Sequence, residues 1–235
     1  RKIYEPVTEP AVLTPTDPRL TVTVSPLLQG VEKYGNVAAV LDPNLVAAVG
    51  MHLSNLFENW KETMPREVVT EHVAINGHPH YDYAEAIPMD TSAGYPYNQG
   101  SKIEKGKRDL FSGEPGEYAI RDKTLMVNVR NRWNYALEGK RYPSLWIDNL
   151  KDERRPLPKV ELGKTRVFVV PPVDYTIIFR RLHFSFLVNF YENALTFFSA
   201  VGIDPESKDW THLYKRLREY GDEGFAGDYS SWDGN

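Results

Sequence analysis

Two carboxylates near the end of the sequence could ligate a divalent cation. Asp228 and Asp233 have four residues between them and follow a short apolar run, Gly224–Ala226. If Gly224–Tyr229 forms a strand, Asp228 lies near its end, where side-chain and backbone oxygens can converge. Hard cations such as Mg²⁺ prefer oxygen ligands, and phosphoryl transfer uses two metals about 4 Å apart. A solvated turn or a helix cap is the commoner explanation of an isolated Asp pair, so the pair needs supporting features.

The strongest supporting feature is a dense run of cations at residues 151–166. This segment carries three anions and six cations, namely Lys151, Arg154, Arg155, Lys159, Lys164 and Arg166. Pro156, Pro158 and Gly163 favour an extended, turning hairpin over a helix. Such a hairpin would present arginine forks and lysine point charges to a triphosphate or a nucleic-acid backbone. A solvated charged loop is the alternative.

A third segment, Thr91–Tyr97, combines small, hydroxyl-bearing and aromatic residues ahead of the basic stretch 102–108. Gly94 and Pro96 predict a tight turn, and small residues let the backbone approach a ligand closely. Hydroxyls such as those of Thr91 and Ser92, with backbone N–H groups, could bind phosphates. Tyr95 or Tyr97 could stack on a base. An ordinary surface turn has the same composition.

The charge distribution supports a local anionic partner. The 235 residues carry 28 basic and 32 acidic side chains, a net charge of −4, but residues 101–166 carry 16 basic and 10 acidic side chains, a net of +6. Both flanking regions are acidic, which indicates a local phosphate-binding site rather than non-specific binding of anions over the whole surface. Zero Cys excludes disulfides, thiolate zinc sites and a thiol nucleophile. No apolar run reaches the roughly 20 residues of a transmembrane span.

The remaining pattern predicts a mixed, α+β fold. Five prolines in residues 5–26 predict an extended N-terminal arm that lies across other elements, with a disordered leader as the alternative. Periodicity and capping signals predict four helices, at residues 43–64, 123–138, 174–195 and 207–220. Short strands are expected at residues 144–148, 166–170 and 224–230. The aromatic residues of 174–198 indicate helix packing rather than a stacking platform. A start at Arg1 and a stop at Asn235 favour the front part of a longer protein.

Together and in this order, the three segments resemble the RNA-dependent RNA polymerases of picorna-like viruses, with the iflavirus and dicistrovirus branch as the nearest match. The resemblance covers about residues 90–235. It implies a right-hand polymerase fold, mostly fingers with the start of the palm, and with the thumb and most of the palm absent. The implied division is an extended arm at 1–40, fingers at 41–222 and the first palm strand at 223–235.

The resemblance also assigns roles to residues. Asp228, with the Tyr229 carbonyl, would ligate catalytic Mg²⁺, with Mn²⁺ as an alternative, and Asp233 would sense the ribose 2′-hydroxyl of the nucleotide. The cations that would hold the triphosphate or line the nucleotide channel are Lys151, Arg155, Lys159, Lys164 and Arg166. The residues that would contact or stack on the template are Thr91, Ser92, Gly94 and Tyr95. The implied reaction is attack of a primer 3′-hydroxyl on an α-phosphate.

Two motifs of the family, Ser/Thr–Asn and Gly-Asp-Asp, do not follow Asp228 in this sequence. We therefore expect the isolated chain to be inactive. The alternatives are a non-catalytic RNA- or nucleotide-binding fingers fragment, a docking surface for an acidic protein, and a reverse transcriptase. The resemblance implies an RNA template and primer, ribonucleoside triphosphates and possible priming by a small viral protein. It also implies membrane-associated replication complexes in the host cytoplasm.

Overall fold

The computed structural model describes residues 7–35, 40–99, 106–197, 199–204 and 206–228. Its α-helices are α1 (Pro26–Val31), α2 (Pro43–Glu58), α3 (Glu71–Asn76), α4 (Lys123–Leu137), α5 (Leu157–Glu161), α6 (Val173–Glu192) and α7 (Asp209–Arg218). Its 3-10 helices are η1 (Glu32–Gly35), η2 (Arg108–Leu110) and η3 (Ala194–Phe197). Its strands are β1 (Thr8–Pro10), β2 (Phe111–Ser112), β3 (Ala119–Ile120), β4 (Ile147–Leu150), β5 (Arg154–Pro156) and β6 (Val167–Val170). The predicted α+β class is confirmed. No described helix is long and apolar enough to cross a membrane.

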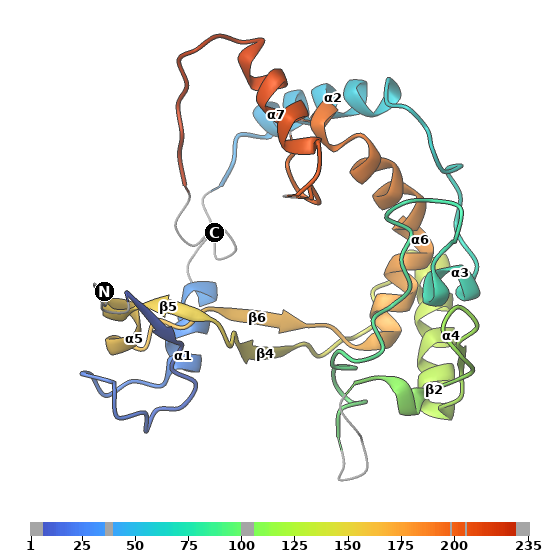
Figure 1. The fold of residues 1–235 in the computed structure, drawn as a ribbon. Coiled ribbons are helices and arrows are strands. Elements are labelled where there is room, and N and C mark those ends of the chain that lie inside the picture. The colour runs from blue at the N-terminus through green and yellow to red at the C-terminus, as the bar shows by residue number, and fades with distance from the viewer. Residues whose placement is uncertain (1–6, 36–39, 100–105, 198, 205, 229–235) are drawn as a thin grey trace.

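Helix α6 is the central packing element of the described fold. Figure 1 shows it continuing from the end of β6 and rising past α4 and α3, and it packs against both of these helices. Its buried face includes Ile177 and Ile178, which join Leu125 and Val129 of α4 in the larger hydrophobic cluster. The predicted helix at 174–195 is thus confirmed, except that its last turn gives way to Asn193 and η3.

The described strands pair as three short antiparallel ribbons, β1 with β5, β2 with β3 and β4 with β6. In the β4–β6 ribbon, Leu150 lies opposite Val167, so the two ends of the cationic segment leave the ribbon side by side. The strand expected at 166–170 is confirmed as β6. The strand expected at 144–148 begins later, at Ile147, because its partner β6 ends at Val170, which pairs with Ile147.

The N-terminal arm lies across the cationic segment, as predicted. Thr8 pairs with Pro156 in the β1–β5 ribbon, and the carbonyl of buried Val12 accepts a hydrogen bond from Thr165 Oγ1 at 2.6 Å. The arm at 1–40 is not extended throughout, because it also contains α1 and η1. Ser25 caps α1, and a proline in its first turn presets the helical φ.

Helix α2 ends earlier than predicted. Residues 59–64 were expected to continue it, but side chains of α6 take their backbone hydrogen bonds. Asn189 Oδ1 accepts from the N–H groups of Thr63, at 2.7 Å, and Met64, at 3.0 Å. Asn193 Oδ1 accepts from the N–H of Lys61 at 3.0 Å. Side-chain amides more than 120 residues away therefore satisfy the backbone N–H groups that were expected to bond within the last helical turns.

Two expectations for the C-terminal region need correction. Helix α4 is confirmed and α7 is shorter than expected, but the described residues 224–228 form no strand. A strand requires a pairing partner, no described segment pairs with these residues, and Phe225 is 98 % exposed. The aromatic residues of α6 are buried to different extents: Phe184 is 3 % exposed, whereas Phe179 and Phe186 are about two-fifths exposed. Ring contacts join Phe186, Phe57 and Trp60.

Candidate nucleotide and template site

The cationic segment is organised around one carboxylate, Glu153. Arg166 donates from Nε to Glu153 Oε1 at 2.6 Å and from its NH2 group to Oε2. Lys151 Nζ lies 3.7 Å from Oε2, and Arg155 NH1 lies 3.5 Å from Oε1. The structure thus brings together Lys151, Arg155 and Arg166, which the sequence singled out, around an acidic residue that it did not.

Backbone pairing fixes this arrangement. The N–H of Lys151 donates to the carbonyl of Arg166 at 2.8 Å, which extends the β4–β6 ribbon by one step. The hydrogen bond from Arg166 is the main cause that lowers the pKa of Glu153, so the carboxylate stays ionised. Three cations around one anion leave a net positive site. Because Arg166 and Lys151 remain about half exposed, both can reach a phosphate from solvent.

A basic cavity of about 330 Å³ adjoins this cluster. Arg155, Lys164 and Arg166 line it together with Lys33 of η1, which the sequence analysis did not single out. Lys159 does not line it, although its carbonyl accepts from the N–H of Lys164 at 2.9 Å. Residues 157–161 form α5 rather than the expected extended hairpin, because proline is tolerated in the first turn of a helix.

The Thr91–Tyr97 segment forms a compact turn with an exposed side. Gly94 has φ +71° and its N–H donates to Ser92 Oγ at 3.2 Å. A Cβ at Gly94 would lie 2.3 Å from the carbonyl oxygen of Pro171, so only glycine fits. Thr91, Ser92 and Tyr95 are exposed, whereas Tyr97 is buried. We call residues 91–97 the template turn, after the role that the resemblance implies for them; Gly94 is buried in it, and the template contacts of all four residues stay a prediction.

The buried ammonium group of Lys107 holds the start of the template turn by hydrogen bonds. Lys107 is 6 % exposed, and its Nζ donates to the carbonyls of Pro88, at 3.1 Å, and Thr91, at 3.0 Å, and to Thr91 Oγ1. Burial lowers the pKa of Lys107 to about 8, against a weaker opposing effect of Asp90. The sequence analysis assigned Lys107 only to the basic stretch 102–108, so its structural role was missed.

The template turn and the β4–β6 ribbon share a cavity of about 560 Å³. Thr91, Ser92 and Lys107 line one side, and Asn149 and Phe168 line the other. The template turn therefore faces the ribbon at whose end the cationic segment begins and ends, whereas the residues of 151–166 themselves do not line this cavity. A single-stranded nucleic acid bound in it would contact hydroxyls of the turn and residues of the β4–β6 ribbon.

The third segment is only partly described. Asp228 is exposed in an irregular stretch, and Tyr229 and Asp233 lie outside the described residues. Asp228 is a suitable ligand for a hard cation by its chemistry. Within the described part of the chain, however, no group of three His, Asp or Glu residues could hold a metal ion. The structure thus provides one donor of the expected metal site.

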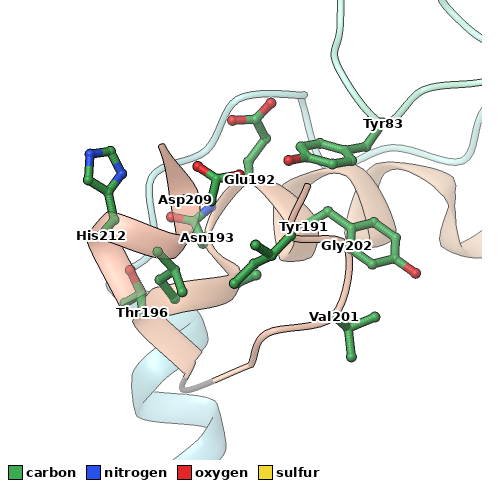
Figure 2. Close-up of a pocket in the computed structure, with 12 residues that line it drawn as sticks. Tyr83, Tyr191, Glu192, Asn193, Thr196, Val201, Gly202, Asp209 and His212 are labelled. Carbon is green, nitrogen blue, oxygen red and sulfur yellow. The ribbon is translucent and has the colours of Figure 1, made fainter. Parts of the chain in front are cut away.

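A further cavity, of about 210 Å³, lies at the far end of α6, away from all predicted site residues. Figure 2 shows Tyr83 and Tyr191 on one side of it, with Glu192, Asp209 and His212 around it. Burial and nearby carboxylates, chiefly Asp209, raise the pKa of Tyr83. The carboxylates of Glu192 and Asp209 in its lining disfavour phosphate.

Comparison with known proteins identifies the class. The family model described as viral RNA-dependent RNA polymerase matches residues 1–235. The chain therefore belongs to the viral RNA-dependent RNA polymerase family, which confirms the resemblance drawn from the three segments and disfavours the reverse transcriptase alternative.

Individual relatives agree with this assignment. The chain is 32 % identical to the replicase polyprotein of Cricket paralysis virus over 99 % of its length, and 37 % identical to that of Acute bee paralysis virus over 72 %. Both are dicistroviruses, the branch that the sequence suggested. The Sicinivirus 3Dpol RNA-dependent RNA polymerase matches 92 % of the chain with a TM-score of 0.73 and 27 % identity.

The match covers only part of these relatives. The chain spans 14 % and 9 % of the two polyproteins and 42 % of the Sicinivirus polymerase. It thus corresponds to part of a right-hand polymerase, in agreement with the expected fold. The division into an arm, fingers and a first palm strand stays a prediction.

Proposed function

We propose that this chain is the part of a viral RNA-dependent RNA polymerase that binds the incoming ribonucleoside triphosphate and guides the RNA template. The observation that carries the proposal is the convergence of Lys151, Arg155 and Arg166 on Glu153, beside the cavity that the ribbon shares with the template turn. Arginine forks and lysine charges suit phosphate oxygens. An arriving triphosphate would draw Arg166 and Lys151 away from Glu153.

The remaining roles follow the same proposal. Lys159 and Lys164 would extend the positive channel, and Thr91, Ser92, Gly94 and Tyr95 would contact the template. Members of the family use divalent metals; Asp228 and the Tyr229 carbonyl would hold Mg²⁺ or Mn²⁺, and Asp233 would contact the ribose. When bound, the ion would stabilise charge during attack of the primer 3′-hydroxyl. Priming by a small viral protein and membrane-associated replication in the host cytoplasm belong to the proposal for the parent protein.

Removing the two exposed cations tests the nucleotide site. Lys151→Ala combined with Arg166→Ala should weaken ATP binding in Mg²⁺ by roughly tenfold or more, because charge-assisted contacts to phosphate are lost. Equilibrium titration with a fluorescent ATP analogue measures this. Lys140→Ala with Arg218→Ala removes the same charge from exposed positions elsewhere and should change the affinity less than twofold. Equal losses in both variants would contradict a specific site.

The same chain should extend no primer. Because the sequence lacks Gly-Asp-Asp, the catalytic metal site would remain incomplete. Gel analysis of a primed RNA with ATP and Mg²⁺ measures extension directly. Extension that Asp228→Ala abolishes would contradict the expectation that the isolated chain is inactive.

A further inference from the structure

Beside the template turn, α4 and α6 are joined by a buried ion pair. Arg132 donates from Nε to Asp174 Oδ2 at 2.9 Å, and its NH2 group lies 2.7 Å from the same oxygen. The side chains are 8 % and 3 % exposed. Asp174 lies in the first turn of α6, where a negative charge also suits the helix dipole.

The remaining surface of the guanidinium is also occupied. Arg132 NH1 donates to Ser144 Oγ at 2.8 Å, which ties α4 to the segment that leads into β4. The Arg132 guanidinium carbon lies 4.7 Å from the ring centroid of Tyr142 and 5.4 Å from that of Tyr175. Ion pair, hydrogen bond and ring contacts together give this side chain one orientation.

The pair is connected to the template turn by several contacts. Tyr97 OH accepts a hydrogen bond from Asn128 at 2.7 Å, one helical turn before Arg132. The N–H of Val173 donates to the carbonyl of Ala93 at 2.9 Å. Tyr95 lines a cavity of about 300 Å³ together with Arg132 and Asp174. Ala93 and Tyr97 of the turn thus hydrogen-bond to Val173 and Asn128, which are neighbours of the ion pair on α6 and α4.

The same junction continues into the nucleotide site. Strand β6 follows Arg166 directly, and Pro171 and Pro172 join it to Val173 and Asp174. We propose that the Arg132–Asp174 pair is a positioning pair, which holds the template turn at a fixed place relative to β6, the strand that directly follows Arg166. The inference rests on the proposed function, because it assigns the turn to template RNA.

General energetics favour positioning over stability as the role of the pair. Replacement of a buried ion pair by apolar residues of similar volume is often neutral or stabilising, because desolvation offsets the attraction between the charges. Apolar residues cannot make the directional hydrogen bonds of the ion pair. Arg132→Met combined with Asp174→Leu should therefore fold, and should release the turn.

Hydrogen exchange in the absence of RNA tests the positioning directly. In the double variant, peptides that cover residues 91–98 should exchange at least tenfold faster, while peptides from α6 beyond Ile178 keep their wild-type rates. Arg218→Met with Asp222→Leu removes an exposed pair and should leave exchange at 91–98 unchanged. Wild-type exchange at 91–98 in a folded double variant would overturn the proposal.

RNA affinity provides the functional readout. The double variant should bind single-stranded RNA roughly tenfold more weakly and bind ATP as the wild type does; unchanged RNA affinity would overturn the role in template binding. Failure of the wild-type chain to bind any RNA would refute the proposed function but leave the exchange test valid. If the double variant does not fold, Tyr97→Phe should speed exchange at 91–98 about threefold, and an unchanged rate would overturn the proposal.

Discussion

Arg132→Met alone is expected to lower the free energy of unfolding by about 3–5 kcal/mol, because it leaves the buried carboxylate of Asp174 without its counter-ion. Asp174 is 2 % exposed, and both of its contacts with Arg132 would be lost. Methionine replaces much of the side-chain volume, so the loss reflects the uncompensated charge rather than a large cavity. Urea unfolding followed by far-UV circular dichroism measures the change.

Lys140→Met is the matched control for this substitution. Lys140 follows α4 and forms an exposed ion pair with Glu138 at 2.7 Å. Exposed pairs contribute about 0–1 kcal/mol, so this variant should unfold within that range of the wild type. A loss below about 1 kcal/mol for Arg132→Met as well would contradict the account of the buried pair.

A second large effect is expected from Lys107 as the pH rises. Its pKa is about 8 in the folded chain, against 10.5 for an ordinary lysine. Below pH 8 both states are protonated and the folded state bears the full cost of the buried charge. Between pH 8 and 10.5 the folded state loses the proton first, so the unfolded state binds more protons and stability increases with pH. Relative to Lys107→Met, the wild type should gain about 2–3 kcal/mol over this range.

Urea unfolding of the wild type and Lys107→Met at several pH values measures this gain. The comparison is made as a difference because other groups, including Tyr97, titrate in both proteins and their contributions cancel. If the difference between the wild type and Lys107→Met is constant from pH 7 to 10.5, the ammonium group does not bear the proposed burial cost.

Local sequence signals predicted the elements that depend on local interactions. Helix α4 begins and ends as expected because Asp122 accepts from the N–H of Leu125 at 2.7 Å and Gly139, with φ +65°, follows its end. The end of α2 was not predictable in this way. The N–H of Thr63, expected in the last turn of this helix, donates instead to the side chain of Asn189, which lies more than 120 residues further along the chain.

The candidate site was predictable in part for the same reason. Residue types and spacing singled out Lys151 and Arg166, and the ribbon register places them together. The role of Glu153 depends on three cations converging in space, although an acidic residue inside a cationic run was a signal available in the sequence. The support from Lys107 depends on burial, which charge patterning does not reveal.

Photocrosslinking with an azido-ATP in Mg²⁺, mapped by mass spectrometry, tests the central claim most directly. If residues 151–166 form the nucleotide site, labelled peptides should come from that segment and from the η1 region around Lys33, which lines the adjoining cavity. Unlabelled ATP should compete, and Lys151→Ala with Arg166→Ala should remove most of the label. Labelling confined to the cavity of Figure 2, around Tyr83 and Tyr191, would contradict the account.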